Sequence, residues 1–129
     1  TGRARRCGWF DAVIVKYAAR VNGITSISFM LLDVLTGFDK IKICTAYKMG
    51  DKIINNFPAS LEDLAKCEPV DEELDGWKED LTNIEKFEDL PENAKKYIAR
   101  IEELIDVNID LVSVGPNRTQ TIIRRNIFE

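Results

Sequence analysis

The sequence predicts an α/β fold in which helices flank a mixed sheet. Apolar runs of strand length, such as Ile24–Leu32 and Ile109–Val114, alternate with segments whose apolar residues repeat at three and four positions, as in a helix. Two turn signals, Asn22-Gly23 and Gly50-Asp51, fall between these segments. Strands that are separated by helices in this way favour a layered α/β arrangement.

The first part of the chain is expected to form a helix followed by a buried strand. Alanines within Asp11–Val21 favour a helix, which Asn22-Gly23 would end, although Val13-Ile14-Val15 alone also suits a strand. As a helix this segment is apolar nearly all round, which predicts burial on most sides. Ile24–Leu32 is continuous and rich in Ile, Phe and Leu, so we expect a central strand that is buried on both faces.

The middle of the chain predicts a hairpin and a short helix. Lys40–Tyr47 alternates between apolar and polar residues, and Gly50-Asp51 would connect it to a partner strand at Lys52–Asn56. Ser60 suits the N-cap of a short helix. The acidic stretch that follows, residues 67–90, is expected to be irregular.

The last part of the chain predicts a long helix and two strands. Pro91 suits the first position of the helix. The apolar residues that follow it repeat at three and four positions: Ala94, Tyr97, Ile98, Ile101, Leu104 and Ile105. Ile109–Val114 then predicts a strand that leads into Gly115-Pro116, and Thr119–Arg125 predicts a final strand.

Composition limits the classes of function. The chain has no histidine, which removes the usual general base at neutral pH and the Ser-His-Asp and Cys-His nucleophile systems. Its net charge is −4 and its one basic segment lies at the start, which argues against nucleic-acid binding. No apolar run reaches the ~18 residues that span a bilayer, and we expect neither a membrane span nor a signal peptide. Three widely spaced cysteines (Cys7, Cys44 and Cys67) fit neither a zinc site nor a disulfide framework, which suggests free thiols in the cytoplasm.

Asp33 is a candidate for guanine recognition. It follows the predicted strand Ile24–Leu32, and ligands of α/β folds gather at the carboxyl ends of strands. Guanine presents two adjacent donors, N1–H and the exocyclic amine, and one carboxylate can accept from both. The alternative is that Asp33 caps the turn at Val34–Gly37, as loop aspartates mostly do.

Two further segments suggest binding of anions or purines. Arg3 and Arg5 flank Ala4, so in an extended loop both point the same way and form a clamp for a dicarboxylate or a phosphate. Ser113–Pro116 follows a strand, with a glycine that permits close approach and a proline ring that suits packing on a purine. The alternatives are a solvated or nucleic-acid-binding basic terminus for the first segment and a plain strand-to-turn connection for the second.

Several segments of the chain resemble, in their order and spacing, the C-terminal part of adenylosuccinate synthetases. They are Thr1–Asp11 (TGRARRCGWFD), Phe29–Leu35 (FMLLDVL), Phe57-Pro58-Ala59, Gly76-Trp77 and Ser113–Arg118 (SVGPNR). The resemblance implies roughly the last third of a larger, P-loop-NTPase-like, GTP-dependent ligase fold. Residues 1–9 would then form a loop for aspartate and IMP, and residues 10–129 an α/β region with guanine-binding elements.

The resemblance also implies a reaction and the residues that serve it. Members of the family use GTP to phosphorylate the 6-oxygen of IMP, after which the amine of L-aspartate displaces the phosphate to give adenylosuccinate. The aspartate and IMP loop would comprise Thr1, Gly2, Arg3, Ala4 and Arg5, with Arg3 on IMP and aspartate and Arg5 also reaching the GTP side. The GTP elements would be Leu31, Leu32, Asp33, Ser113, Val114, Gly115 and Pro116. The family usually has Lys where this chain has Leu31 and Asp where it has Asn117.

Family parts that lie outside these segments are expected elsewhere in the enzyme. The chain has no GxxxxGK[ST] loop, so we expect the phosphate loop, the base and the Mg²⁺ ligands in the N-terminal part, and neither catalytic nor metal-binding residues here. The chain alone is expected to be inactive, and the complete enzyme to be a cytoplasmic homodimer that binds neither nucleic acid nor membrane. Two alternatives are an autonomous guanine-nucleotide-binding module without catalysis and an acidic structural or interaction domain.

Overall fold

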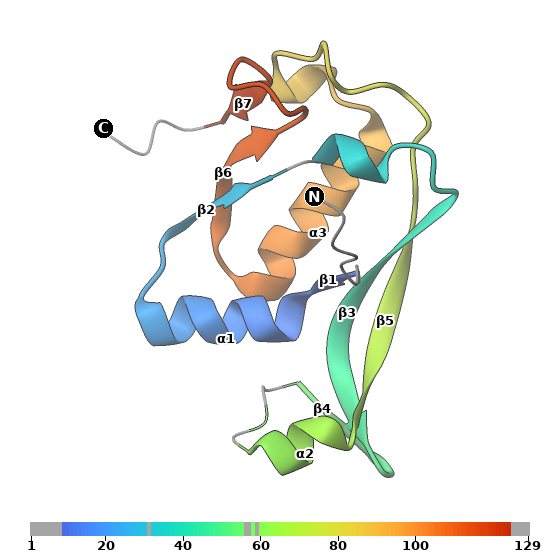
Figure 1. Ribbon diagram of the computed structural model, residues 1–129, viewed down its shortest axis with the longest axis vertical. Helices are drawn as coiled ribbons and strands as arrows, with labels where there is room; N and C mark the ends of the chain where they lie inside the picture. The colour runs from blue at the N-terminus through green and yellow to red at the C-terminus, as the bar shows by residue number, and fades with distance from the viewer. Residues whose placement is uncertain (1–8, 31, 56–57, 59, 125–129) are drawn as a thin grey trace, which may run out of the picture.

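The computed structural model describes residues 9–30, 32–55, 58 and 60–124, and it confirms the mixed α/β class (Figure 1). Two sheets and two long helices form the described part of the chain. The strands are β1 (Phe10–Asp11), β2 (Ser26–Phe29), β3 (Lys40–Met49), β4 (Lys52–Ile54), β5 (Cys67–Asp75), β6 (Asn108–Ser113) and β7 (Thr121–Ile123). The helices are α1 (Ala12–Asn22), α2 (Leu61–Ala65) and α3 (Glu92–Ile105), with 3₁₀ turns η1 (Leu32–Leu35) and η2 (Phe87–Asp89).

The first sheet is built around β3. β4 and β5 both pair with β3 in antiparallel fashion, and the short β1 pairs with it in parallel. The β3–β5 pair forms a long arm along one side of the molecule, with β4 and α2 at its far end (Figure 1). The predicted hairpin around Gly50 is confirmed. Gly50 has a φ of 62°, a left-handed conformation that glycine adopts without strain.

The second sheet has the order β2-β6-β7. β2 and β6 run parallel, with Phe29 opposite Val112, and β7 returns antiparallel to β6. The buried Asp110 carboxylate accepts a hydrogen bond of 2.6 Å from the Ser26 hydroxyl, which ties the first residue of β2 to β6. The carboxyl ends of β2 and β6 therefore lie at the same edge of the sheet.

The helices begin and end where local chemistry predicts. Asp11 caps α1, because its carboxylate accepts from the amides of Val13 and Ile14, and Gly23 ends the helix in a left-handed conformation. The Ser60 hydroxyl accepts from the Asp63 amide at the start of α2, as predicted. The apolar face of α3 is confirmed as a core face, since five of its six predicted residues are buried and Leu104 packs at the margin.

The helix α1 is not buried on most sides as predicted, since Ile14 and Val21 are exposed. The structure also corrects two predictions about strands. Ile24–Leu32 is not a central strand buried on both faces: only four of its residues form β2, which lies at one end of the sheet within the described residues. Ile24 and Met30, at 38% and 65% exposure, lie outside the strand. Residues 67–90 are not irregular throughout, because Cys67–Asp75 forms β5.

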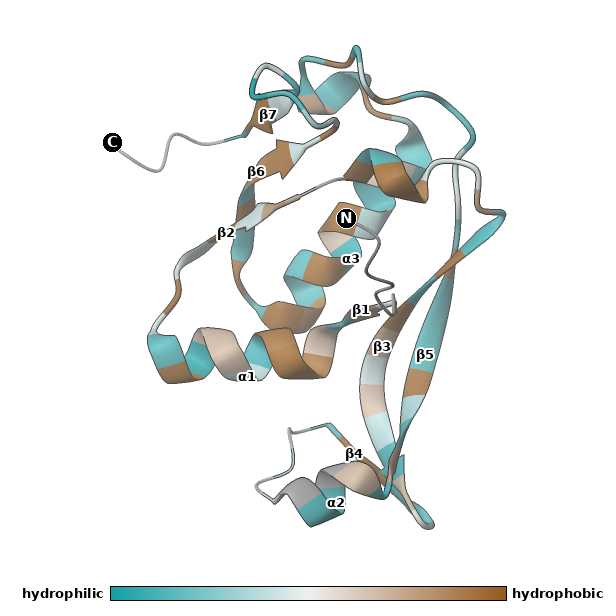
Figure 2. Cartoon of the chain, viewed as in Figure 1, coloured by the Kyte–Doolittle hydropathy of each residue, from teal (hydrophilic) through white to brown (hydrophobic). Residues whose placement is uncertain are grey.

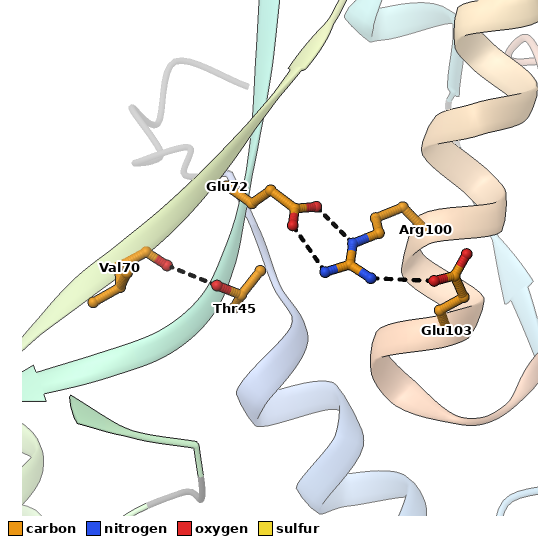
Figure 3. A network of polar contacts seen from close by, with 5 residues as sticks. All are labelled: Thr45, Val70, Glu72, Arg100 and Glu103. Atoms are coloured by element: carbon orange, nitrogen blue, oxygen red, sulfur yellow. Dashed lines mark hydrogen bonds and ion pairs between the residues drawn. The ribbon is translucent and has the colours of Figure 1, made fainter.

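An ion pair explains why β5 contains an inward-facing carboxylate. Val70, Glu72 and Leu74 are half-buried and alternate with exposed residues along the strand. Glu72 receives two hydrogen bonds from Arg100 of α3, at 2.6 and 2.8 Å, and Arg100 also pairs with Glu103 (Figure 3). The fork of Arg100 therefore connects the arm to α3.

The main core lies between α3 and the two sheets. Figure 2 shows apolar residues along β6, along one face of α3 and at the start of α1. The residues of this core that are fully buried include Leu32, Ile41, Ile43, Leu81, Ile98, Ile101, Ile109, Val112 and Val114. Because Leu32 and Val114 belong to it, the segments that follow β2 and β6 start from fixed positions.

Candidate functional site

The carboxyl ends of β2 and β6 bring the predicted guanine elements together. Asp33 lies in η1, which follows β2, and η1 contacts β6. Ser113 is the last residue of β6 and Gly115 comes two residues later. Segments 80 residues apart in sequence thus meet at one edge of the parallel pair, the usual place for ligands in an α/β sheet.

The side chain of Asp33 is aimed into the protein without a partner. Its Oδ1 atom is buried and accepts no hydrogen bond from the residues that the structure describes. The turn after it is closed instead by backbone groups, since the Thr36 amide donates to the Asp33 carbonyl at 3.1 Å. The carboxylate therefore does not cap this turn, and a buried oxygen that can accept two hydrogen bonds stays available.

The turn that carries Asp33 is fastened to the segment that begins at Trp77. The buried Trp77 indole donates to the Thr36 hydroxyl at 2.9 Å, and that hydroxyl donates to the Glu79 carbonyl at 3.0 Å. The Gly37 amide donates to the Trp77 carbonyl at 2.9 Å. Gly76 is fixed in turn, because a Cβ there would lie 1.9 Å from the Phe38 carbonyl oxygen. Gly76-Trp77 thus holds the Asp33 turn in place.

The turn after β6 is also closed internally. The Ser113 hydroxyl donates to the Gly115 carbonyl at 3.0 Å, and the Val114 amide donates to the Gln120 carbonyl at 2.8 Å. The amide of the buried Gly115 has no hydrogen-bond partner within the described residues. Pro116 is exposed. The turn therefore offers a backbone donor and an apolar ring directly after the end of β6.

Sequence reasoning placed some of the candidate residues and left others untested. Leu32 is fully buried in the core, so its backbone alone is available to a ligand. Leu31 and the loop Thr1–Arg5 lie outside the described residues. The supporting roles of Trp77 and Gln120 were not predicted, because their partners are some 40 residues away in the sequence. The one feature of the sequence that pointed to this support was the Gly76-Trp77 pair, which belongs to the family resemblance.

A second polar cluster lies at the start of α1, away from this edge. The Tyr47 hydroxyl donates to Asp11 Oδ2 at 2.5 Å, and burial followed by this bond and the Asp11 charge raises the pKa of Tyr47. Burial, assisted by the Asp11 charge, also raises the pKa of Cys44 to about 11. Cys44 is a buried, free, protonated thiol and therefore a poor nucleophile.

The described part of the chain builds neither a metal site nor a membrane span. Its Cys, Asp and Glu side chains form no group of three or more that is placed for a metal ion. None of its helices is long and apolar enough to cross a membrane.

Comparison with known proteins gives one consistent family. The family model described as adenylosuccinate synthetase matches residues 1–122. The adenylosuccinate synthetase of Clostridioides difficile is 83% identical over 99% of this chain, and that of Thermoanaerobacter sp. is 63% identical over 98%. A solved structure, fully ligated adenylosuccinate synthetase from Plasmodium falciparum, superposes with a TM-score of 0.90 at 38% identity and covers 95% of this chain.

Each of these relatives is much longer than this chain. The chain spans about 30% of the length of the curated relatives that it matches and 30% of the Plasmodium chain. Its sequence and fold nevertheless match over nearly its whole length. The chain belongs to the adenylosuccinate synthetase family.

Proposed function

We propose that this chain is the guanine- and aspartate-recognising part, roughly the C-terminal third, of an adenylosuccinate synthetase. The complete enzyme joins IMP and L-aspartate at the expense of GTP. The observation that supports this role best is the buried, unpartnered Asp33 carboxylate oxygen beside the end of β6. An unsatisfied buried acceptor costs about 1–3 kcal/mol, and a ligand with donors in the right place recovers that free energy.

Guanine supplies the donors that Asp33 lacks. Its N1–H and exocyclic amine lie side by side, and a carboxylate accepts from both, whereas adenine offers no such pair. The Gly115 amide would donate to the guanine O6, and the Pro116 ring would pack on the base. Ser113 and Val114 would shape the turn, since their own donors are engaged within it. Leu32 would contribute backbone, and Leu31 an apolar contact.

Residues 1–9 would serve the other substrates. We propose that Thr1–Arg5 closes over L-aspartate, with Arg3 contacting IMP and aspartate and Arg5 contacting aspartate and the GTP side. A guanidinium pairs with a carboxylate or a phosphate through two parallel hydrogen bonds, which suits both ligands. This loop lies outside the described residues, so the proposal rests on the sequence.

The reacting groups would come from the rest of the enzyme. A base for N1 of IMP, a phosphate-cradling loop and the ligands of Mg²⁺ belong to the N-terminal part, and Mg²⁺ would neutralise charge on the transferred phosphoryl group. The described residues form no group of three or more side chains that could hold this ion. We expect the assembled enzyme to be a cytoplasmic homodimer.

The outer face of α1 supports a large partner within the same enzyme. Ile14 and Val21, at 43% and 63% exposure, lie seven positions apart on this helix, with the half-exposed Tyr17 between them. Exposed apolar side chains that gather on one helix face are typical of an interface. The part of the enzyme that this chain does not span, about 70% of its relatives' length, is the partner that we propose for this face.

Nucleotide preference of an Asp33 variant tests the proposed function. In the complete enzyme, Asp33→Asn replaces part of the acceptor with a donor, and xanthine offers an acceptor where guanine has its amine. We expect GTP use to fall and the relative preference for XTP to rise by tenfold or more, at about 1–3 kcal/mol per mispaired group. The measurement is kcat/KM for GTP and XTP at saturating IMP and aspartate.

The matched control is Asp51→Asn, the same substitution at an exposed hairpin turn. It should leave the ratio of GTP to XTP use unchanged. A folded Asp33→Asn enzyme with the parental preference would show that Asp33 does not read guanine.

A further inference from the structure

We propose that Gln120 is a positioning residue for the guanine pocket, which it serves by holding the turn after β6 in its ligand-ready conformation. This inference rests on the proposed function. Gln120 follows the turn segment Ser113–Arg118 in sequence, and neither the composition nor the pattern around it suggests a role. The role is indicated by the contacts of Gln120 within the described structure.

Gln120 connects to the turn through both its backbone and its side chain. Its carbonyl accepts from the Val114 amide at 2.8 Å, and its Oε1 accepts from the Asn117 amide at 3.0 Å. Its own amide donates to the Asn117 carbonyl at 3.0 Å. These bonds close the loop from Val114 to Gln120, and the one to the Asn117 amide depends on the Gln120 side chain.

The carboxamide of Gln120 also lies directly against Gly115. A Cβ built on Gly115 would come within 2.2 Å of Gln120 Oε1 and 2.4 Å of its Cδ. The absence of a side chain at position 115 is therefore what admits the carboxamide. With Gln120 packed on one side of it, the position of the Gly115 backbone depends on the Gln120 side chain, and its amide is the donor proposed above for the guanine O6.

The side chain of Gln120 ties the turn to the same segment that holds Asp33. Its Nε2 donates to the Thr82 carbonyl at 3.2 Å. Trp77 and Glu79, in the same stretch, hold the Thr36 hydroxyl next to the Asp33 turn. The fully buried Leu81 anchors this stretch in the core. Residues 77–82 thus form a bracket that sets the spacing between the two halves of the pocket.

The role predicts a specific kinetic signature in the complete enzyme. Gln120→Met keeps the length of the side chain and removes its two polar contacts, one with the turn and one with the bracket. We expect KM for GTP to rise about tenfold, while kcat at saturating GTP and KM for IMP and aspartate stay within about twofold. Thr119→Met, an exposed neighbour in the same loop, is the matched control and should leave KM for GTP unchanged.

A second variant separates positioning from general stability. Gln120→Glu keeps an acceptor for the Asn117 amide and loses the donor to Thr82, so its KM for GTP should lie between those of the parent and Gln120→Met. A melting temperature that falls with KM for GTP unchanged in both folded variants would overturn the proposal. If Gln120→Met does not fold, an unchanged KM for GTP in Gln120→Glu overturns it alone.

The outcome for Gln120 can be distinguished from that for the proposed function. If Asp33→Asn shifts the preference towards XTP and the Gln120 variants leave KM for GTP unchanged, the guanine pocket stands and the positioning role fails. If Asp33→Asn has no effect on nucleotide preference, the proposed function itself fails. The expected result is a shift in both series.

Discussion

The carboxylate of Asp11 both caps a helix and accepts a hydrogen bond from a tyrosine of the first sheet. Oδ1 accepts from the amides of Val13 and Ile14 at 3.0 and 3.1 Å and so begins α1, while Oδ2 accepts from the Tyr47 hydroxyl of β3. The start of a helix is thereby fixed to the middle of the first sheet. The same arrangement raises the pKa of Tyr47 and keeps it a donor at neutral pH.

Removal of this carboxylate should destabilise the enzyme more than loss of a helix cap alone. Asp11→Ala leaves the first amides of α1 and the Tyr47 hydroxyl without an acceptor, at about 1 kcal/mol for the cap and about 1 kcal/mol for the hydrogen bond. We expect the free energy of unfolding to fall by about 2 kcal/mol, measured by denaturant titration. Asp11→Asn, which can still cap, should cost less. Equal losses for Asp11→Ala in the parent and in a Tyr47→Phe background would show that the hydrogen bond between Asp11 and Tyr47 adds nothing to stability.

At the scale of elements, the strand β5 depends on an ion pair with α3. Glu72 is the one half-buried acid of the acidic edge strand β5, and Arg100 binds it with two nitrogen atoms (Figure 3). Each side chain is about a third exposed, at 34% and 35%, so water screens the pair in part. The bidentate geometry places its contribution at the upper end of the range for exposed pairs.

Loss of the pair should loosen the arm by a small, measurable amount. Glu72→Gln is expected to cost about 1 kcal/mol of unfolding free energy. Glu103→Gln is the matched control, because Glu103 bonds the same arginine through one contact at 3.2 Å and is 67% exposed. It should cost a few tenths of that amount. Equal effects from the two variants in denaturant titrations would contradict the assignment.

The helix α3 could be predicted from the sequence, but the strand β5 could not. α3 was predictable because its apolar residues repeat at helical spacing. β5 was not, because Glu72 interrupts the inward apolar alternation and Pro69 disfavours a strand, and only the distant Arg100 and the edge position beside β3 make both acceptable. The length of β2 was overestimated, because a continuous apolar run does not show at which residue the pairing with a neighbouring strand ends.

The site divides in the same way. The positions of Asp33 after an apolar run and of Ser113–Pro116 at the end of a predicted strand could be read from the sequence, while their role in binding guanine stays a prediction. Trp77 and Gln120 act through hydrogen bonds to residues about 40 positions away, and no local pattern encodes such contacts.

At the scale of the whole molecule, one apolar face of α1 is not covered by any other part of the described structure. The sequence predicted burial on most sides, yet Ile14 and Val21 are exposed. The remainder of the enzyme, in our proposal, covers this face and supplies the base and phosphate loop.

Two measurements test that arrangement. The chain alone should form no adenylosuccinate from IMP, aspartate and GTP, and adding the missing part should restore turnover if the two associate. Val21→Asp should weaken that association by tenfold or more, because it places a charge in an apolar contact. Arg20→Asp, in the same helical turn, is the control and should act weakly. Product from the isolated chain would refute the division of roles.

The parallel pairing of β2 with β6 has a consequence for biosynthesis. Ser26 and its partner Asp110 are 84 positions apart, and ribosomes add about 5–20 residues per second. β2 therefore leaves the ribosome roughly 4–17 seconds before the strand that pairs with it. During that interval β2 lacks its partner β6, and an unpaired strand edge is a place where other chains can associate.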